Sequence, residues 1–299
     1  MRLGLIGTGH WATTVHGRGV VNHPTAELVG VWGRNPDRTR DAAHVLNTRA
    51  YTNLDDLVAD VEALTFAVPP DVQASIGADA ARAGKHVLLE KPIATSASDA
   101  QKLQAAVDQG GGASIVFFTR RFVPELEGWL EQLERSGGWE CARVEMASAI
   151  FVDGSPFGHS PWRRDKGALW DVGPHALSTL IPLLGPVESV AAGAGVRDQV
   201  HLVLRHTGGR SSTASLSLTV PPAAVGNSLY VYGEQGREES PSGHFDTAAA
   251  YQRALDALIE QAERAKPGHP CDVHFGAQVV EVLAAAEASL RTGRRMELL

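Results

Sequence analysis

Hydrophobic and polar positions follow two different patterns along the chain, and the change falls near residues 118–124. In the first part, short apolar runs alternate with longer segments that have a helical period. The apolar runs predict buried strands at residues 2–6, 27–32, 62–68, 86–90 and 113–118. The segments between them predict helices at residues 10–22, from Pro36 onward, at 72–83 and at 96–109. Strands and helices that alternate at this spacing predict a parallel, doubly wound sheet.

The later part of the chain has strand-like segments in which apolar and polar residues alternate, which is typical of an antiparallel sheet. These segments are residues 139–151, 186–193, 199–206, 210–219 and 228–233. A helical segment at about 169–184 interrupts them, and two alanine-rich amphipathic segments follow at 246–265 and 274–292. The expected fold is α/β, with one domain over residues 1–119 and a second over residues 120–299.

A glycine-rich turn follows the first predicted strand. Gly7-Thr8-Gly9-His10-Trp11-Ala12 has the form G-x-G-x-x-A and opens the first predicted helix. Gly7 permits a tight turn, Gly9 lets a pyrophosphate approach the backbone, and the small Ala12 lets helix and strand pack closely. The helix N-terminus adds unpaired N–H groups and the positive end of a dipole. The turn predicts a dinucleotide site, against the alternative of a glycine-rich turn without a ligand.

The end of the second predicted strand bears on the choice of nucleotide. A site that prefers NAD usually carries an acid here for the ribose hydroxyls, whereas this strand ends in Gly33-Arg34-Asn35. A guanidinium can hold the 2′-phosphate of NADP through paired, charge-assisted hydrogen bonds. Arg38, one helical turn further on, supplies a second cation. NADP is therefore favoured over NAD, the alternative being that both arginines are solvated surface charges.

Several short motifs, spread over nearly the whole chain, occur together in one order. They are GTGHWA at the start, AGKHVLLEKPIA at 83–94, TRRF at 119–122, PWR at 161–163, DVGPH at 171–175 and the closing ASLRTGRRMEL. In this combination the chain resembles the Gfo/Idh/MocA oxidoreductase family. The resemblance implies a Rossmann domain, then an α/β domain with a mainly antiparallel open sheet. It also implies NAD(P)-dependent redox chemistry on sugars, cyclitols or related compounds, a homodimer or homotetramer built through the second sheet, and a cis Lys91–Pro92 peptide.

Lys91 stands at the carboxyl end of a predicted parallel strand, where open α/β sheets bind their ligands. Pro92 fixes the backbone beside it, so the ammonium is aimed. The resemblance makes Lys91 a catalytic and substrate-binding group that polarises or orients the substrate oxygen. It also places Val68, Pro69, Glu90 and Lys91 against the cofactor. From the residues alone, the alternative that Lys91 is an ordinary surface lysine is supported about equally.

Asp171 and His175 are four residues apart, and Pro174 between them suits a first helical turn. Histidine is a natural proton donor or acceptor for alcohol–carbonyl conversion near neutral pH. We expect His175 to exchange the proton of the reacting oxygen. Asp171 would tune the pair of Lys91 and His175 and bind a substrate hydroxyl. Lys91 and His175 can exchange roles within the family. The competing interpretation is that Asp171 caps a helix and His175 packs in it.

Further site residues follow from the resemblance. Trp162 and Arg163 resemble a pair that lines the nicotinamide end of the site, although Trp162 by itself would fit a core aromatic. Arg120, at the domain junction, is a candidate substrate contact, with a solvated role as the alternative. His159 and His10 are candidates in loops. The chain departs from the family pattern at Gln73, which replaces a usual histidine, and in a short segment between Trp162 and Asp171.

Composition limits the partners. The formal net charge of −7 argues against nucleic acid or an anionic membrane surface as the main partner. Two widely separated cysteines, no signal-peptide pattern and no apolar run that spans a bilayer favour a cytoplasmic chain. Neither His201 with His206 nor the His269, Cys271 and His274 group has the spacing of a metal site, so no metal is expected. A dehydrogenase or reductase of a polyhydroxylated or carbonyl compound is the leading hypothesis, and a non-catalytic dinucleotide-binding regulator is the rival.

Overall fold

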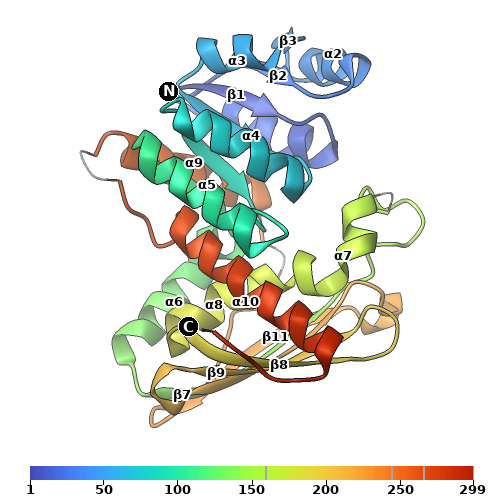
Figure 1. Cartoon of the computed structure of the whole chain (residues 1–299), viewed down its shortest axis with the longest axis vertical. Coiled ribbons are helices and arrows are strands. Elements are labelled where there is room, and N and C mark those ends of the chain that lie inside the picture. The colour runs from blue at the N-terminus through green and yellow to red at the C-terminus, as the bar shows by residue number, and fades with distance from the viewer. Residues whose placement is uncertain (159, 244, 265–266, 299) are drawn as a thin grey trace. The chain divides into compact units, whose positions relative to one another are not determined.

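The structure is a computed structural model that describes residues 1–158, 160–243, 245–264 and 267–298. The chain forms two compact units (Figure 1). The first comprises Met1–Val123 with Asp246–Ala277, and the second comprises Pro124–Phe245 with Gln278–Leu299. The sequence predicts one boundary at residues 119 and 120, whereas the chain returns to the first unit at Asp246. The return has a physical cause, because α9 (Thr247–Ala262) buries Tyr251 and Leu255 in the first unit.

The first unit is built on a six-stranded sheet in the order β3-β2-β1-β4-β5-β6, and every pairing in it is parallel. The strands are β1 (Arg2–Ile6), β2 (Glu27–Trp32), β3 (Arg49–Tyr51), β4 (Ala63–Phe66), β5 (His86–Glu90) and β6 (Ser114–Phe117). The predicted doubly wound parallel sheet is confirmed. The short β3 was not predicted, because a strand of three residues is too short to show an alternation of apolar and polar positions.

Helices connect these strands. They are η1 (Ala12–Gly17), α1 (Arg18–Val21), α2 (Pro36–Val45), α3 (Leu54–Asp60), α4 (Pro70–Arg82), α5 (Ala97–Gly110) and the 3₁₀ turn η2 (Thr119–Phe122). Side-chain oxygens of Asn35 and Ser96 cap α2 and α5, which is why these helices begin where the sequence predicts. The predicted helix at 10–22 differs in one respect, because η1 is a π-helical stretch and His16 on it is fully buried.

The second unit contains a seven-stranded sheet in the order β12-β11-β7-β10-β9-β8-β13. The strands are β7 (Trp139–Ala147), β8 (Val187–Ala194), β9 (Val200–His206), β10 (Ser211–Ser217), β11 (Gly226–Gly233), β12 (Gly236–Glu239) and β13 (Met296–Glu297). Only the pairing of β7 with β10 is parallel. The prediction of a mainly antiparallel sheet is thus confirmed, with one parallel step inside it.

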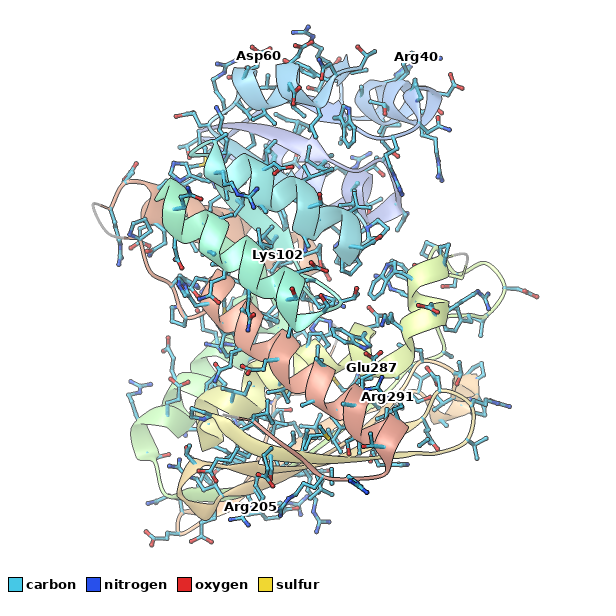
Figure 2. The ribbon with its side chains drawn as sticks, in the orientation of Figure 1. Arg40, Asp60, Lys102, Arg205, Glu287 and Arg291 are labelled. Atoms are coloured by element: carbon cyan, nitrogen blue, oxygen red, sulfur yellow. The ribbon has the colours of Figure 1, made fainter. Side chains whose placement is uncertain are left out.

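Helices accompany one face of this sheet, and the other face carries polar side chains. The helical segments are α6 (Pro124–Ser136), α7 (Pro161–Asp171), α8 (Gly173–Leu184), the 3₁₀ turns η3 (Thr207–Gly209) and η4 (Pro222–Ala224), and α10 (Val273–Thr292), which starts in the first unit. Along β9, buried and exposed residues alternate, so that Arg205 is exposed and labelled on the sheet in Figure 2. In the described part of the chain, no helix has both the length and the apolar character needed to cross a membrane.

Candidate active site

The glycine turn after β1 has the geometry that its sequence predicts. Gly7 has φ 135°, and a Cβ added there would lie 2.4 Å from the carbonyl oxygen of Ala67. The Gly7 N–H donates to the Trp32 carbonyl oxygen at 2.9 Å, which ties the turn to β2. A Cβ at Gly9 would meet no atom within 4 Å, and Gly9 is exposed. The backbone at Gly9 is therefore open to a ligand, while Gly7 cannot be replaced without strain.

The end of β2 leaves little room for an acidic side chain. A Cβ at Gly33 would lie 2.6 Å from Cγ2 of Thr8 and 3.2 Å from Oγ1 of Thr39. Asn35 is occupied in capping α2, where its side-chain oxygen accepts the Arg38 N–H at 3.0 Å. Arg34 and Arg38 are exposed. The only charges that these predicted cofactor residues offer at this strand end are therefore positive.

The turn after β5 is held by a buried glutamine. The Lys91–Pro92 peptide is cis, as the resemblance implies. Gln73, which is fully buried on α4, accepts the Glu90 N–H at 2.7 Å and donates to the Glu90 carbonyl at 2.7 Å. Gln73 also reaches the Pro92 carbonyl oxygen at 3.3 Å. The residue that replaces a histidine of the family pattern therefore fixes the backbone on both sides of Lys91.

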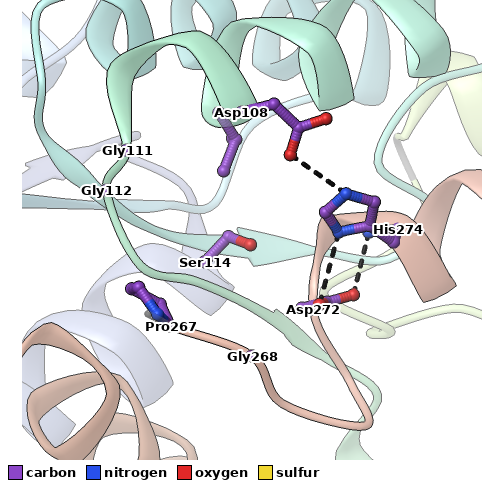
Figure 3. Close-up of a pocket in the computed structure, with 9 residues that line it drawn as sticks. Asp108, Gly111, Gly112, Ser114, Pro267, Gly268, Asp272 and His274 are labelled. Atoms are coloured by element: carbon purple, nitrogen blue, oxygen red, sulfur yellow. Dashed lines mark hydrogen bonds and ion pairs between the residues drawn. The ribbon is translucent and has the colours of Figure 1, made fainter. Parts of the chain in front are cut away.

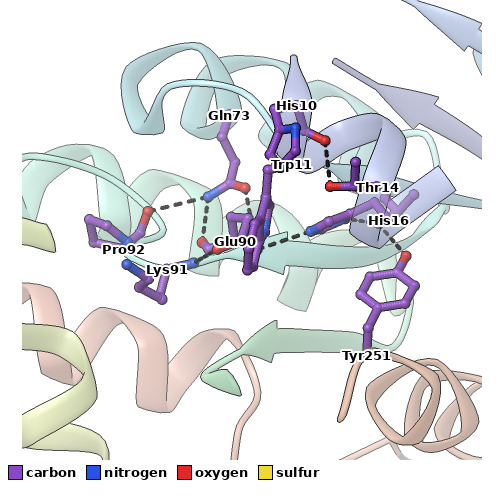
Figure 4. A network of polar contacts seen from close by, with 10 residues as sticks. His10, Trp11, Thr14, His16, Gln73, Glu90, Lys91, Pro92 and Tyr251 are labelled. Atoms are coloured by element: carbon purple, nitrogen blue, oxygen red, sulfur yellow. Dashed lines mark hydrogen bonds and ion pairs between the residues drawn. The ribbon is translucent and has the colours of Figure 1, made fainter. Parts of the chain in front are cut away.

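Three hydrogen-bonding groups contact the Glu90 carboxylate (Figure 4). Its Oε1 accepts from Trp11 Nε1 at 2.7 Å and lies 2.9 Å from His16 Nε2, and its Oε2 accepts the Lys91 N–H at 3.2 Å. Trp11 belongs to the glycine turn after β1, whereas Lys91 follows β5. One carboxylate thus joins the two segments that the sequence predicts to hold the cofactor and the substrate oxygen.

In the second unit, Asp171 is paired with an arginine. Arg163 Nε donates to Asp171 Oδ2 at 3.1 Å, and the Asp171 side chain is only 9% exposed. The guanidinium also lies over the Trp162 ring, 4.7 Å from its centroid, and over the Phe157 ring. A buried carboxylate requires a counter-charge to remain ionised. Arg163 therefore supplies a counter-charge to the Asp171 carboxyl group and fixes its orientation.

His175 lies in the first turn of α8, and its N–H donates to the Val172 carbonyl oxygen at 3.1 Å. Asp171 is the last residue of α7 and stands just before α8, while His175 lies inside α8, as Pro174 in a first helical turn predicts. Asp171 is not the cap of α8, because that position is Val172 and has no side-chain cap. The backbone at Gly173 lies close to α10, since a Cβ there would lie 2.8 Å from Cδ2 of Leu283.

A surface pocket of about 380 Å³ lies elsewhere on the first unit, lined by residues 107–114 and 267–274 (Figure 3). In it, His274 contacts Asp108 at 3.0 Å and Asp272 at 3.3 Å. The pocket adjoins Ser114, where β6 begins, whereas ligands of open α/β sheets bind at the carboxyl ends of strands. It is therefore not the expected cofactor site. Within the described ranges, no group of three His, Cys, Asp or Glu residues could hold a metal ion.

Two family models match the chain in the order of its two parts. The model described as an oxidoreductase family with an NAD-binding Rossmann fold, GFO/IDH/MocA, matches residues 1–118. The GFO/IDH/MocA C-terminal domain matches residues 140–239. The chain belongs to the Gfo/Idh/MocA family.

Individual members of the Gfo/Idh/MocA family are similar over most of the chain. The rhizopine catabolism protein MocA of Rhizobium meliloti is 27% identical over 311 residues, covering 96% of this chain and 93% of that protein. Several other curated relatives match over only 54% to 61% of their own length.

Solved structures of the family share the fold of the chain. The WlbA dehydrogenase of Bordetella pertussis, in complex with NADH and UDP-GlcNAcA, has a TM-score of 0.84 at 24% identity, covering 100% of this chain and 99% of that one. A myo-inositol dehydrogenase of Corynebacterium glutamicum has a TM-score of 0.84 at 19% identity, with the same coverage.

The predicted site residues of this family member fall into two groups. Gly7, Thr8, Gly9, His10, Trp11, Gly33, Arg34, Asn35, Arg38, Val68, Pro69, Glu90, Lys91 and Arg120 lie in the first unit, and Trp162, Arg163, Asp171 and His175 lie in the second. Burial lowers the pKa of the Arg120 guanidinium, which still leaves a cation near neutral pH. His159 lies outside the described residues. The sequence did not single out His16, Thr65 or Tyr251, because their partners are far away along the chain.

Proposed function

We propose that the chain is an NAD(P)-dependent oxidoreductase that transfers hydride to or from a sugar, a cyclitol or a similar hydroxyl or carbonyl compound. The observation that carries the proposal is the shared use of Glu90 by Trp11 of the glycine turn and by the Lys91 amide. β1, β4 and β5 are neighbours in one parallel sheet, so their carboxyl ends form one edge. The segments that follow these strands therefore contribute to one ligand-binding edge, as in other open sheets of this kind.

In this proposal the bound nucleotide supplies the hydride acceptor or donor at its nicotinamide ring. During oxidation of an alcohol, the C–H bond breaks with its electron pair, and the hydroxyl proton passes to His175. Lys91 stabilises the negative charge that develops on that oxygen. Asp171, paired with Arg163, orients the substrate through a hydroxyl. Reduction of a carbonyl runs through the same residues in reverse.

We further propose that NADP is preferred over NAD. The support is the absence of an acid at the end of β2, where Thr8 would crowd even a Cβ at Gly33. The exposed Arg34 and Arg38 at the same place offer the positive charge that a 2′-phosphate requires. The relative of known structure that was solved with NADH shows that the family fold also accepts the other nucleotide.

The substrate class follows from the family relatives and remains a proposal for this chain. WlbA was solved with a UDP-linked sugar derivative, and the Corynebacterium glutamicum neighbour is named a myo-inositol dehydrogenase. We propose a small polyhydroxylated compound, and assembly as a homodimer or homotetramer through the open face of the second sheet. The cytoplasmic location expected from the sequence also stays a prediction, which fractionation of the producing cells would check.

The assay follows NADPH oxidation with aldoses, keto sugars and small dicarbonyls, and NADP reduction with sugars and cyclitols. We expect turnover with at least one class, and a fall in kcat of about 10²-fold or more in Lys91→Ala and His175→Ala, because each removes a group that handles charge or a proton. Lys102→Ala is the matched control, since Lys102 is exposed on α5 and pairs with Asp99. Turnover that both site substitutions leave intact would contradict the assignment. Tight nucleotide binding without turnover on any class would favour the regulator.

A further inference from the structure

A line of buried polar groups leads from the E-K-P turn into the interior of the first unit (Figure 4). From its geometry we infer that His16 is a positioning residue, which holds the Glu90 carboxylate and through it sets the place of Lys91 and of Trp11. The inference deepens the proposed function, on which it rests for the chemical role of Lys91. The contacts that carry it all belong to the first unit.

His16 is held at both ring nitrogens. Its side chain is 0% exposed, its Nε2 lies 2.9 Å from Glu90 Oε1, and its Nδ1 lies 2.7 Å from Thr65 Oγ1. Thr65 Oγ1 in turn lies 2.8 Å from the Tyr251 hydroxyl. The His16 ring is tilted against the Tyr251 ring at 4.6 Å between centroids and meets the edge of Phe117 at 6.1 Å. The imidazole is therefore confined by packing as well as by hydrogen bonds.

The direction of these hydrogen bonds follows from what each group can donate. An ionised Glu90 only accepts, so His16 must carry a proton on Nε2. In the neutral ring, Nδ1 is then an acceptor, which Thr65 satisfies with its hydroxyl proton, and Tyr251 satisfies the Thr65 oxygen with its own. Every group in the line is satisfied in this arrangement.

The line ends inside the first unit and does not reach the surface there. Tyr251 is 0% exposed, so its hydroxyl has no contact with bulk solvent. Burial is also the main cause that raises the pKa of Tyr251, which therefore stays protonated and can act as the donor that the line requires. The line of His16, Thr65 and Tyr251 thus holds the Glu90 carboxylate from its buried side. At its other end, Glu90 holds the Lys91 N–H and the Trp11 indole, so a loss of His16 loosens both.

Two substitutions of His16 separate positioning from mere packing. His16→Gln places an amide N–H near the position of Nε2 and keeps a donor for Glu90. His16→Asn reaches only as far as Nδ1 and leaves Glu90 without that donor. With a substrate found in the panel, we expect His16→Asn to lower kcat by about 10- to 100-fold, since small displacements of reacting groups have effects of this size. His16→Gln should recover most of the loss, and thermal denaturation would verify that both variants fold.

Two readouts do not depend on turnover, so they decide the inference even if the proposed function fails. In protein labelled with ¹⁵N-histidine, NMR should show a proton on Nε2 of His16, assigned by its loss in His16→Asn. After reductive ¹³C-methylation, the Lys91 signal, assigned with Lys91→Arg, should shift or broaden in His16→Asn and stay in place in His16→Gln. An Nε2 that carries no proton, or a Lys91 signal unchanged in folded His16→Asn, would overturn the positioning role. Equal effects of the two variants on that signal would assign His16 to packing alone.

Discussion

Single side chains in the first unit decide what its glycine-rich segments can accept. Thr8 stands where an acid after β2 would have to fit, since a Cβ at Gly33 would lie 2.6 Å from it. Arg34, the next residue, is exposed. This arrangement predicts that nucleotide preference depends on the charge of Arg34.

We therefore expect Arg34→Ser to lower kcat/KM for NADPH by about 10-fold or more, because a charge-assisted hydrogen bond contributes about 1.5–3 kcal/mol. The value for NADH should change little. Arg40→Ser is the control, since Arg40 is exposed on α2, the helix that follows Arg34, and pairs with Asp37. Steady-state kinetics with each nucleotide would check this. Equal losses with NADPH and NADH, or a wild-type preference for NADH, would contradict NADP preference.

Backbone features that a local motif dictates could be predicted from the sequence. The tight turn at Gly7 and the cis Lys91–Pro92 peptide fall into this class. His16 does not, because its partners Thr65 and Glu90 lie 49 and 74 positions further along the chain. A histidine within an apolar helical segment was the one signal available, and it names no partner.

At the level of elements, strands and helices could be predicted where the period of apolar positions extended over enough residues. The predicted helix at 169–184 instead divides into α7 and α8 at Val172, and Gly167 in α7 has a non-helical φ of 62°. The apolar period of the sequence continues across the break at Val172, so a pattern alone cannot reveal it. At Gly173 the backbone lies close to α10, since a Cβ there would lie 2.8 Å from Cδ2 of Leu283.

His206 links three elements of the second unit and makes its stability depend on pH. The ring is 0% exposed, with Nδ1 2.7 Å from the Gly185 carbonyl after α8 and Nε2 2.8 Å from Ser212 Oγ on β10. Burial is the main cause that lowers the pKa of His206. As pH falls below the unfolded value of about 6.5, the unfolded chain takes up the proton first. The stabilisation is therefore complete above that pH and declines as pH falls toward the folded pKa.

We expect the free energy of unfolding of the wild type to fall between pH 7.5 and pH 5.5, by about 1.4 kcal/mol for each unit of pKa shift. His206→Gln should be less stable at pH 7.5 and lose less on acidification. Urea denaturation followed by fluorescence at the two pH values measures both quantities. His201→Gln is the control, because His201 is exposed on the opposite face of β9. His86 and His269, whose pKa values burial also lowers, contribute equally to all three proteins. A pH slope that is the same in His206→Gln and the wild type would exclude the role of His206.

For the molecule as a whole, the sequence predicted two domains but not the path of the chain between them. The strand pattern changes near residue 118, as the two family models also divide the chain. The return of α9 to the first unit leaves no such mark, because an amphipathic helix has the same period whichever unit it packs on. Its cause lies in single contacts such as Tyr251 with Thr65.

The open face of the second sheet bears on assembly. Register places Val203, Thr213, Arg143 and Tyr230 side by side across β9, β10, β7 and β11. Val203 is 55% exposed in this row, and an apolar side chain at the middle of a sheet face is a natural contact for a second copy. In a twofold interface the same row meets itself, so a charge added to it is opposed by its copy.

Val203→Asp should therefore shift the protein from an oligomer toward the 31.7 kDa monomer, because two carboxylates would be buried without a counter-charge. Sedimentation equilibrium of the full chain measures this directly. Val196→Asp is the matched control, since Val196 is 75% exposed in the turn between β8 and β9, away from the row, and should leave the mass unchanged. If the wild type itself sediments as a monomer, or if Val203→Asp keeps the wild-type mass, then the open face does not join copies of this chain.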